Sequence, residues 1–205
     1  MTPARRQPAT GDPTRLGAVV LTGGTGSRMG GADKAAIELD GVTLLERALA
    51  ATATASEVVV VGPPVPTSRP VLWTVEDPPG GGPAAGVLAA LDRFPVPPDL
   101  VAVLAVDMPR VRAGTLRRLT ATVEGDACLD GALLVDAGGS RQPLAAVYRY
   151  RSLTAARPSR PEDENGLPVR RLVGGLRLAE VAAHHDEARD VDSWADVRDL
   201  REGRP

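Results

Sequence analysis

The stretch Leu21-Thr-Gly-Gly-Thr-Gly-Ser-Arg-Met-Gly-Gly-Ala-Asp-Lys34 follows directly on the apolar run Leu16–Leu21, which is typical of a buried strand. It places five glycines around one arginine and one lysine. Glycine adopts positive φ and leaves no side chain in the way, so such a loop can bring several backbone N–H groups onto a phosphate chain. Lys34 is the only lysine in the chain, and a compact ammonium with three donors suits a mobile phosphate chain better than a planar guanidinium. The stretch therefore predicts a nucleotide triphosphate site.

Apolar runs and helical patterns alternate along the rest of the chain. The run 57–62 is apolar and β-branched, as in a strand buried on both faces. Thr43-Leu-Leu-Glu46 has capping-box spacing and predicts the start of a helix. This alternation predicts a three-layer α/β fold with a mostly parallel sheet. The predicted strands cover 16–21, 57–62, 71–75, 100–106, 131–136 and 142–148, with a short extended piece at 35–39; the predicted helices cover 43–55, 84–93, 113–123 and a segment from Ser193 on; a charged, proline-rich loop covers 157–168.

Length and composition narrow the class of protein. We expect residues 1–15 to form a disordered leader, since they lack an apolar core segment, and residues 16–203 to form a single domain. A net charge of −2 argues against nucleic acid as a partner, and the absence of an apolar stretch of about 20 residues argues against a membrane span. One cysteine, Cys128, excludes an internal disulfide framework and is compatible with a reducing, cytoplasmic location.

Two general phosphate-binding motifs do not fit the first loop. A P-loop needs Gly-Lys-Ser/Thr, whereas Lys34 follows an aspartate and precedes an alanine. The dinucleotide-binding fingerprint needs a third glycine where Met29 stands, and the acidic residue expected about 20 positions later would be near Glu46, inside a predicted helix. These departures weaken a nicotinamide or flavin interpretation without removing it.

The stretch from Leu21 to Lys34 resembles the signature of the MobA-like nucleotidyltransferases, and its Asp-Lys ending resembles the molybdenum cofactor guanylyltransferase branch. Three later motifs agree in order and spacing: Glu76-Asp77 with Gly82-Pro-Ala-Ala-Gly86, Val106-Asp107-Met-Pro109, and Arg141-Gln-Pro-Leu144. The resemblance covers about residues 16–200. It implies a three-layer, Rossmann-like nucleotidyltransferase fold and transfer of GMP from GTP to the phosphate of molybdopterin, with release of pyrophosphate. A molybdoenzyme or a cofactor-carrier protein would be the implied protein partner.

The nucleophile of that reaction is already an anionic phosphate, so neutralisation of charge and in-line positioning matter more than a general base. Asp107 follows an apolar strand, at the end where ligands of open α/β sheets bind, and we assign it as the protein ligand of Mg²⁺. Lys34 is assigned to neutralise the phosphate oxygens as pyrophosphate leaves, and Arg28 is given a similar role. The adjacent His184 and His185 are expected to be exposed.

The resemblance also implies contacts to the nucleotide. Backbone groups of Leu21, Thr22 and Gly23 would face the guanine and ribose, Gly24 and Gly26 would lie along the triphosphate, and Asp77 matches a position that touches the nucleotide in relatives. Relatives often carry an asparagine just after the second strand, where this chain has Gly62. That side-chain contact is therefore missing.

The acceptor side is less strongly specified. Arg141, Gln142, Arg170 and Arg171 are candidate contacts for an anionic pterin, because bidentate pairing of arginine with phosphate is strong, but they are equally compatible with plain surface charge. Asp192 is either a second metal contact or a residue that serves the start of the helix at Ser193.

Three alternatives to guanylyl transfer stay open at this point. One is a related transferase that uses CTP or another phosphorylated acceptor, and another is a non-catalytic nucleotide-binding accessory protein. Retention of the single lysine at Lys34 and of Asp107 argues against the accessory protein. The third is a nicotinamide-dependent oxidoreductase.

Overall fold

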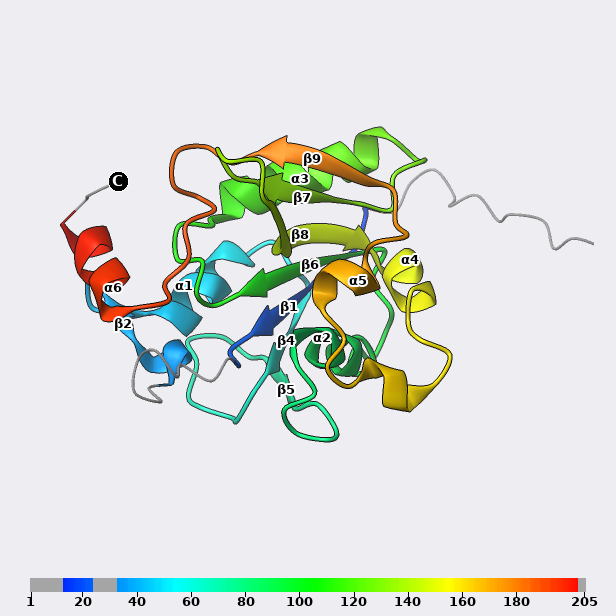
Figure 1. The fold of residues 1–205 in the computed structure, drawn as a ribbon, viewed down its shortest axis with the longest axis horizontal. Helices are drawn as coiled ribbons and strands as arrows, with labels where there is room; N and C mark the ends of the chain where they lie inside the picture. Colours follow the sequence, from blue (N-terminus) through cyan, green and yellow to red (C-terminus); the bar gives the residue numbers. More distant parts are fainter. Residues whose placement is uncertain (1–12, 24–32, 203–205) are drawn as a thin grey trace, which may run out of the picture.

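The computed structural model describes residues 13–23 and 33–202 and has three layers, with a seven-stranded sheet between two layers of helices (Figure 1). Helices α2, α4 and α5 cover one face, and α1 and α3 cover the other. The expected three-layer fold is confirmed. The strands are β1 (Leu16–Leu21), β4 (Glu57–Val61), β5 (Leu72–Thr74), β6 (Leu100–Ala105), β7 (Gly131–Val135), β8 (Arg141–Arg149) and β9 (Leu178–Ala182), and the helices are α1 (Leu44–Ala51), α2 (Pro83–Leu91), α3 (Ala113–Gly125), α4 (Tyr150–Ala155), α5 (Val169–Leu172) and α6 (Trp194–Arg201).

The order of the strands places a crevice next to the first strand. The sheet runs β5-β4-β1-β6-β8-β7-β9, and β5, β4, β1 and β6 are all parallel. Strand β8 is antiparallel to both of its neighbours, and β9 returns parallel to β7. The chain moves from β1 to β4 and β5 on one side, and then crosses back to β6 on the other. The carboxyl ends of β1 and β6 therefore meet at a topological switch point, where open α/β sheets bind their ligands.

The apolar runs form these strands because the sheet is covered on both faces. All six residues of β1 and all six of β6 are buried. Alternate residues of β1 contribute to the two cores: Val20 packs on the side of α1 and α3, and Val19 on the side of α2. Helix α2 lies close to the sheet because Gly86 has no side chain; a Cβ there would lie 3.2 Å from side-chain atoms of both Leu21 and Val61.

The six predicted strands are present within one residue at each end, and three predictions of local structure need correction. The first helix ends at Ala51 instead of residue 55. The piece 35–39 is mostly a 3-10 turn, η2 (Lys34–Ala36), followed by β2 (Glu38–Leu39), which pairs with β3 (Val42–Thr43). The turn between β2 and β3 falls at Asp40 and Gly41, as predicted, and both have positive φ.

The third correction concerns the proline-rich loop, which carries the short 3-10 helix η3 (Pro161–Glu164) and is attached to α2 at both ends. Arg157 donates to the carbonyl of Leu88 at 2.9 Å and pairs with Asp92 at 2.8 Å. Near the start of α2, the N–H of Gly166 donates to the carbonyl of Gly81 at 2.8 Å. The segment therefore connects the glycine-rich loop before α2, which contains Gly81 and Gly82, with α5.

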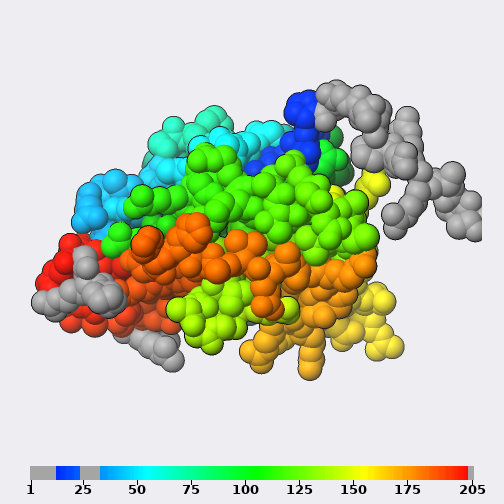
Figure 2. Space-filling model, turned by 90° about the horizontal axis from the view of Figure 1, so that it is seen from above, coloured from blue at the N-terminus to red at the C-terminus, as the bar shows by residue number. Residues whose placement is uncertain are grey.

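Segments far apart in the sequence meet at one end of the sheet. The chain after β9 runs along the molecule beside α3 and leads to α6, as the orange and red surfaces of Figure 2 show. Helix α6 then packs near β2, which follows the first glycine loop. No helix within residues 13–23 and 33–202 is long and apolar enough to cross a membrane. Most of the expected leader, residues 1–12, lies outside the described residues.

Candidate functional site

Three charged side chains meet at the carboxyl ends of β1 and β6. The ammonium of Lys34 donates to Asp107 Oδ2 at 3.1 Å and to Asp192 Oδ1 at 2.8 Å. The lysine side chain is only 10% exposed, whereas the side chain of Asp107 is 28% exposed and that of Asp192 is 48% exposed. The cation thus lies on the inner side of two carboxylates that also face outward.

Each member of this group is held by a local feature of the backbone. Lys34 opens η2, and the side chain of Asp33 caps that turn by accepting the N–H of Ala35 at 3.0 Å. Asp107 comes two residues after the end of β6, and its carbonyl accepts the N–H of Val191 at 2.8 Å. That bond fixes the loop leading to Asp192 against the end of β6.

The position of Asp192 bears on the two roles predicted for it. Ser193 is the N-cap of α6, and Asp196 accepts the backbone N–H groups of both Ser193 and Asp192. The start of the helix therefore uses the backbone of Asp192, and its carboxylate is directed to Lys34. The contact of its Oδ1 with Lys34 is compatible with a role as a cation ligand.

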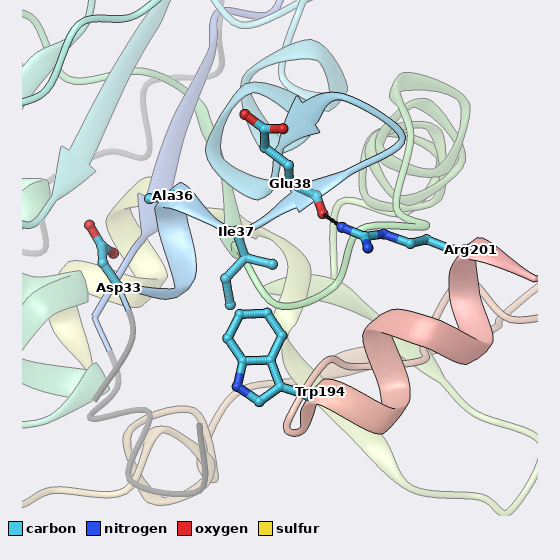
Figure 3. Close-up of a pocket in the computed structure, with 6 residues that line it drawn as sticks. All are labelled: Asp33, Ala36, Ile37, Glu38, Trp194 and Arg201. Carbon is cyan, nitrogen blue, oxygen red and sulfur yellow. Dashed lines mark hydrogen bonds between the residues drawn. The ribbon is translucent and has the colours of Figure 1, made fainter. Parts of the chain in front are cut away.

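Helix α6 is attached to the segment that carries Lys34. Figure 3 shows the ring of Trp194 next to Ile37, and the guanidinium of Arg201 donates to the carbonyl of Glu38 at 2.8 Å. A shallow pocket of about 310 Å³ lies between these residues and Asp33. These contacts join both ends of α6 to the region around η2 and thereby hold Asp192 close to Lys34.

The charges in the group influence one another. Burial lowers the pKa of Lys34, but the hydrogen bond to Asp192 and the charge of Asp107 outweigh it, so the pKa lies above its usual value. Burial and the charges of Asp192 and Asp107 raise the pKa of a third carboxyl group, that of Asp190. Sequence reasoning missed Asp190, although its spacing of two residues from Asp192 on an extended segment is a signal that both could face the same site.

At the end of β1, where the base is expected to bind, several backbone groups already form hydrogen bonds within the protein. The N–H of Thr22 and its hydroxyl both donate to the carbonyl of Val61, at 3.1 and 2.7 Å, and the carbonyl of Leu21 accepts the N–H of Val106 at 3.0 Å. Gly23 is exposed. The hydroxyl of Thr22 occupies the space beside Gly62, since a Cβ at that glycine would lie 2.0 Å from the hydroxyl oxygen. The missing asparagine is thus replaced by a close contact between the ends of β1 and β4.

Several predicted nucleotide contacts lie apart from this group or outside the described residues. Asp77 is exposed in the loop after β5, two strands away from β1. Gly24, Gly26 and Arg28 lie outside the described residues. The two histidines are exposed, as predicted.

A cleft of about 410 Å³ opens beside Asp107 on the side of the antiparallel strand β8. Among the four candidate acceptor contacts, Arg141, Gln142 and Arg170 line it, and Arg171 does not. The cleft also receives Asp190 from the C-terminal loop. A lining that combines two guanidinium groups and an amide with Asp107 can accommodate a polar, anionic molecule next to the Lys34 group.

The donor set near Lys34 is suited to Mg²⁺ supported by a substrate. Within the described residues, no group of three or more histidine, cysteine, aspartate or glutamate side chains could hold a metal ion. Mg²⁺ is commonly bound by only one or two carboxylates, with the remaining ligands supplied by phosphate oxygens and water. Asp107 and Asp192 provide such a pair, because both approach the same ammonium.

Comparisons with known proteins identify the family of the chain. A family model described as a MobA-like NTP transferase domain matches residues 18–182. A protein from Opitutus terrae named "Probable molybdenum cofactor guanylyltransferase" is 35% identical over 191 residues, which cover 87% of this chain and 90% of that protein.

Solved structures show the same fold. A molybdopterin-guanine dinucleotide biosynthesis protein A from Archaeoglobus fulgidus superposes with a TM-score of 0.68 at 20% identity, covering 91% of this chain and 97% of its own. A 2-C-methyl-D-erythritol 4-phosphate cytidylyltransferase from Thermus thermophilus gives 0.62 at 19% identity, covering 90% and 96%.

Proposed function

The chain belongs to the MobA-like NTP transferase family, and from that premise we propose that it transfers GMP from GTP to the phosphate of molybdopterin and releases pyrophosphate. The observation that carries the proposal is the bridge from the single lysine of the chain, Lys34, to Asp107 at the switch point of the sheet. It joins a residue of the first loop to one at the end of β6, as a site for a triphosphate and its metal requires. The name of the Opitutus relative supports guanine and molybdopterin as substrates.

In this reaction an oxygen of the acceptor phosphate attacks the α-phosphorus of GTP, and the bond to the β-phosphate oxygen breaks. The attacking group is already an anion, so no side chain needs to remove a proton. Lys34 neutralises the growing negative charge on the departing pyrophosphate, and we assign the same task to Arg28. We also assign the backbone N–H groups of Gly24 and Gly26 to the triphosphate.

We propose that Mg²⁺ is held by Asp107, with Asp192 within reach of it. Bound there, the ion would neutralise phosphate charge and order the triphosphate. Asp107 has the smaller exposed fraction of the two carboxylates and lies two residues after the end of β6, so we assign it as the principal ligand.

For the nucleotide, we assign the carbonyl of Thr22, the exposed backbone of Gly23 and the second lone pair of the Leu21 carbonyl to the base and ribose. The Leu21 carbonyl already accepts the N–H of Val106, and the N–H of Thr22 is used within the sheet. Carbonyl oxygens accept hydrogen bonds, and the Watson–Crick edge of guanine offers N–H donors. Asp77 would reach the nucleotide from the loop after β5.

For the acceptor, Arg141, Gln142 and Arg170 line the cleft beside Asp107, and we assign them to the pterin and its phosphate. Arg171 lies outside this lining. The single-domain organisation of residues 16–203, a cytoplasmic location and delivery of the acceptor by a carrier protein or to a molybdoenzyme belong to the same proposal.

The proposal is tested by measuring pyrophosphate release with GTP, CTP or ATP, each with and without molybdopterin. We expect release only with GTP, Mg²⁺ and molybdopterin together. Equal or faster release with CTP would replace guanylyl transfer with cytidylyl transfer, and release that does not depend on the acceptor would remove molybdopterin from the reaction.

A further inference from the structure

We propose that Lys34 and a divalent cation compete for the same two carboxylates, so that the lysine closes the cation site until the metal arrives with the nucleotide. This inference deepens the proposed function, because it concerns the regulation of the same site. It rests on the position of the ammonium between Asp107 and Asp192. Binding of phosphate alone would not require the lysine to contact two carboxylates.

The ammonium occupies the inner position of the pair. Lys34 Nζ lies 3.1 Å from Asp107 Oδ2 and 2.8 Å from Asp192 Oδ1, and its side chain is largely buried. Within the described residues, the contacts of Nζ are with these two oxygens and do not include a backbone carbonyl. The lysine thus provides the positive charge that holds two neighbouring carboxylates together.

A metal bound by the same carboxylates would bring a charge of +2 next to this ammonium. Like charges at such a distance repel strongly where water is partly excluded. The two cations also seek the same oxygen lone pairs, so either the metal stays weakly bound or Nζ moves away. Asp107 lines the cleft, and the partly exposed carboxylates of Asp107 and Asp192 leave room for a cation to approach while the lysine still occupies the inner side.

Displacement of the lysine would connect metal binding with the chemistry. When a metal takes over the two carboxylates, the ammonium is released near the carboxyl ends of β1 and β6, where the triphosphate is expected. A lysine that stayed paired with two carboxylates would have little charge to offer to phosphate. The same side chain therefore acts first as a temporary counter-ion and then as a phosphate ligand.

The test measures the binding of Mn²⁺ to nucleotide-free protein by electron paramagnetic resonance, with Lys34→Met compared with the unaltered chain. Methionine removes the charge and keeps much of the length of the side chain. We expect Mn²⁺ to bind at least tenfold more tightly to Lys34→Met. Lys34→Arg, which keeps the charge, should bind as weakly as the unaltered protein.

Arg157→Met is the matched control, since it removes another partly buried cation, paired with Asp92 at 2.8 Å on the far end of α2. It should leave Mn²⁺ binding unchanged. If Lys34→Met binds Mn²⁺ no more tightly than the unaltered chain does, or if neither binds it, competition is contradicted. No GTP or pterin is present, so this result is independent of whether guanylyl transfer occurs.

A second measurement does not depend on the variant being folded. Because the chain has one lysine, protein grown with ¹³C-labelled lysine gives a single ε-methylene signal in nuclear magnetic resonance spectra. We expect titration with Mg²⁺ to shift this signal with the same half-saturation that Mg²⁺ shows in displacing Mn²⁺. A lysine signal that does not move while the metal site fills would overturn the proposal.

Discussion

The two halves of the sheet form their parts of the site in different ways. On the side of β1, the side chain of Lys34 is 10% exposed and is held by two carboxylates from distant parts of the chain. On the side of β8, Arg141 pairs with Glu180 at 2.6 Å, but their side chains are 56% and 53% exposed. The proposed nucleotide half, around Lys34 and Asp107, is held by ion pairs of a largely buried lysine. The proposed acceptor half, around Arg141, presents long, exposed side chains at the rim of a cleft. This difference suggests that the first half determines the rate of the chemistry and the second half the affinity for the acceptor.

The largest expected effect tests the nucleotide half. Asp107→Ala should lower turnover at least about 100-fold, because it removes the principal metal ligand and one of the two partners of Lys34. Pyrophosphate release at saturating substrates measures it, and circular dichroism checks the fold. Asp163→Ala, on the exposed helix η3, should keep the rate within about twofold. A near-normal rate in Asp107→Ala would show that the site has been placed wrongly.

The next effect concerns the contact between the ends of β1 and β4. Gly62→Ala should lower the free energy of unfolding by about 2–3 kcal/mol, because φ is +148° there and the new Cβ would lie 2.0 Å from Thr22 Oγ1. Denaturant titration measures it. Adding Thr22→Ala should restore part of the loss, since it removes the clash and leaves the backbone strain. Gly125→Ala, where a Cβ meets nothing within 4 Å, should change stability by less than about 0.5 kcal/mol.

A third prediction concerns Glu187, in the loop between β9 and α6. Although burial raises the pKa of Glu187, hydrogen bonds from Arg118, Thr115 and the N–H of His184 lower it from 4.5 to about 2. A lowered pKa stabilises the folded state above the unfolded value and loses that contribution as the pH falls toward the folded value. Glu187→Gln should therefore cost about 2 kcal/mol at pH 7 and nothing near pH 2.

Melting curves at pH 7, 4, 3 and 2 measure this pH dependence. Glu180→Gln is the comparison, because the pair that Glu180 forms is exposed and should contribute less than about 1 kcal/mol. If the deficit of Glu187→Gln persisted unchanged down to pH 2, its cause would be altered packing and not the carboxylate charge.

The smallest effect tests the acceptor half. Arg170→Ala should raise the KM for molybdopterin about tenfold and leave the KM for GTP unchanged, because a charged hydrogen bond to phosphate contributes about 1.5–3 kcal/mol. The neighbouring Arg171→Ala is the matched control, since Arg171 does not line the cleft. Equal effects of the two changes would show that the arginines act only through general charge. A loss of turnover at saturating acceptor would contradict the division of labour between the halves.

The nucleotide half can be predicted from the sequence because its determinants are local. Continuous apolar runs specify β1 and β6, and the residues that follow them must lie at the same edge of the sheet. Lys34 and Asp107 are identified on that basis, and the structure joins them. The contact between Asp192 and Lys34 could not be predicted, because it depends on how α6 packs against β2.

The acceptor half is harder to predict because its elements are short and only half-buried. Strand β9 is interrupted by Glu180 and has no buried residue, and α5 is a helix of four residues. Neither gives a periodic signal long enough to identify. Arg141 and Arg171 carry the same charge in the same composition, and only the position of the cleft separates them.

The bridge from Lys34 to Asp192 also has a consequence for the order in which the protein is made. These residues are 158 positions apart, so during translation Lys34 is synthesised long before Asp192. Contacts so distant in sequence form late, after the strands between them have assembled. A nascent chain can form β1 and β6 while its ammonium still has only Asp107 as a partner. The contact between Lys34 and Asp192 therefore forms only when α6 docks. The formation of this contact marks the end of folding and can be measured.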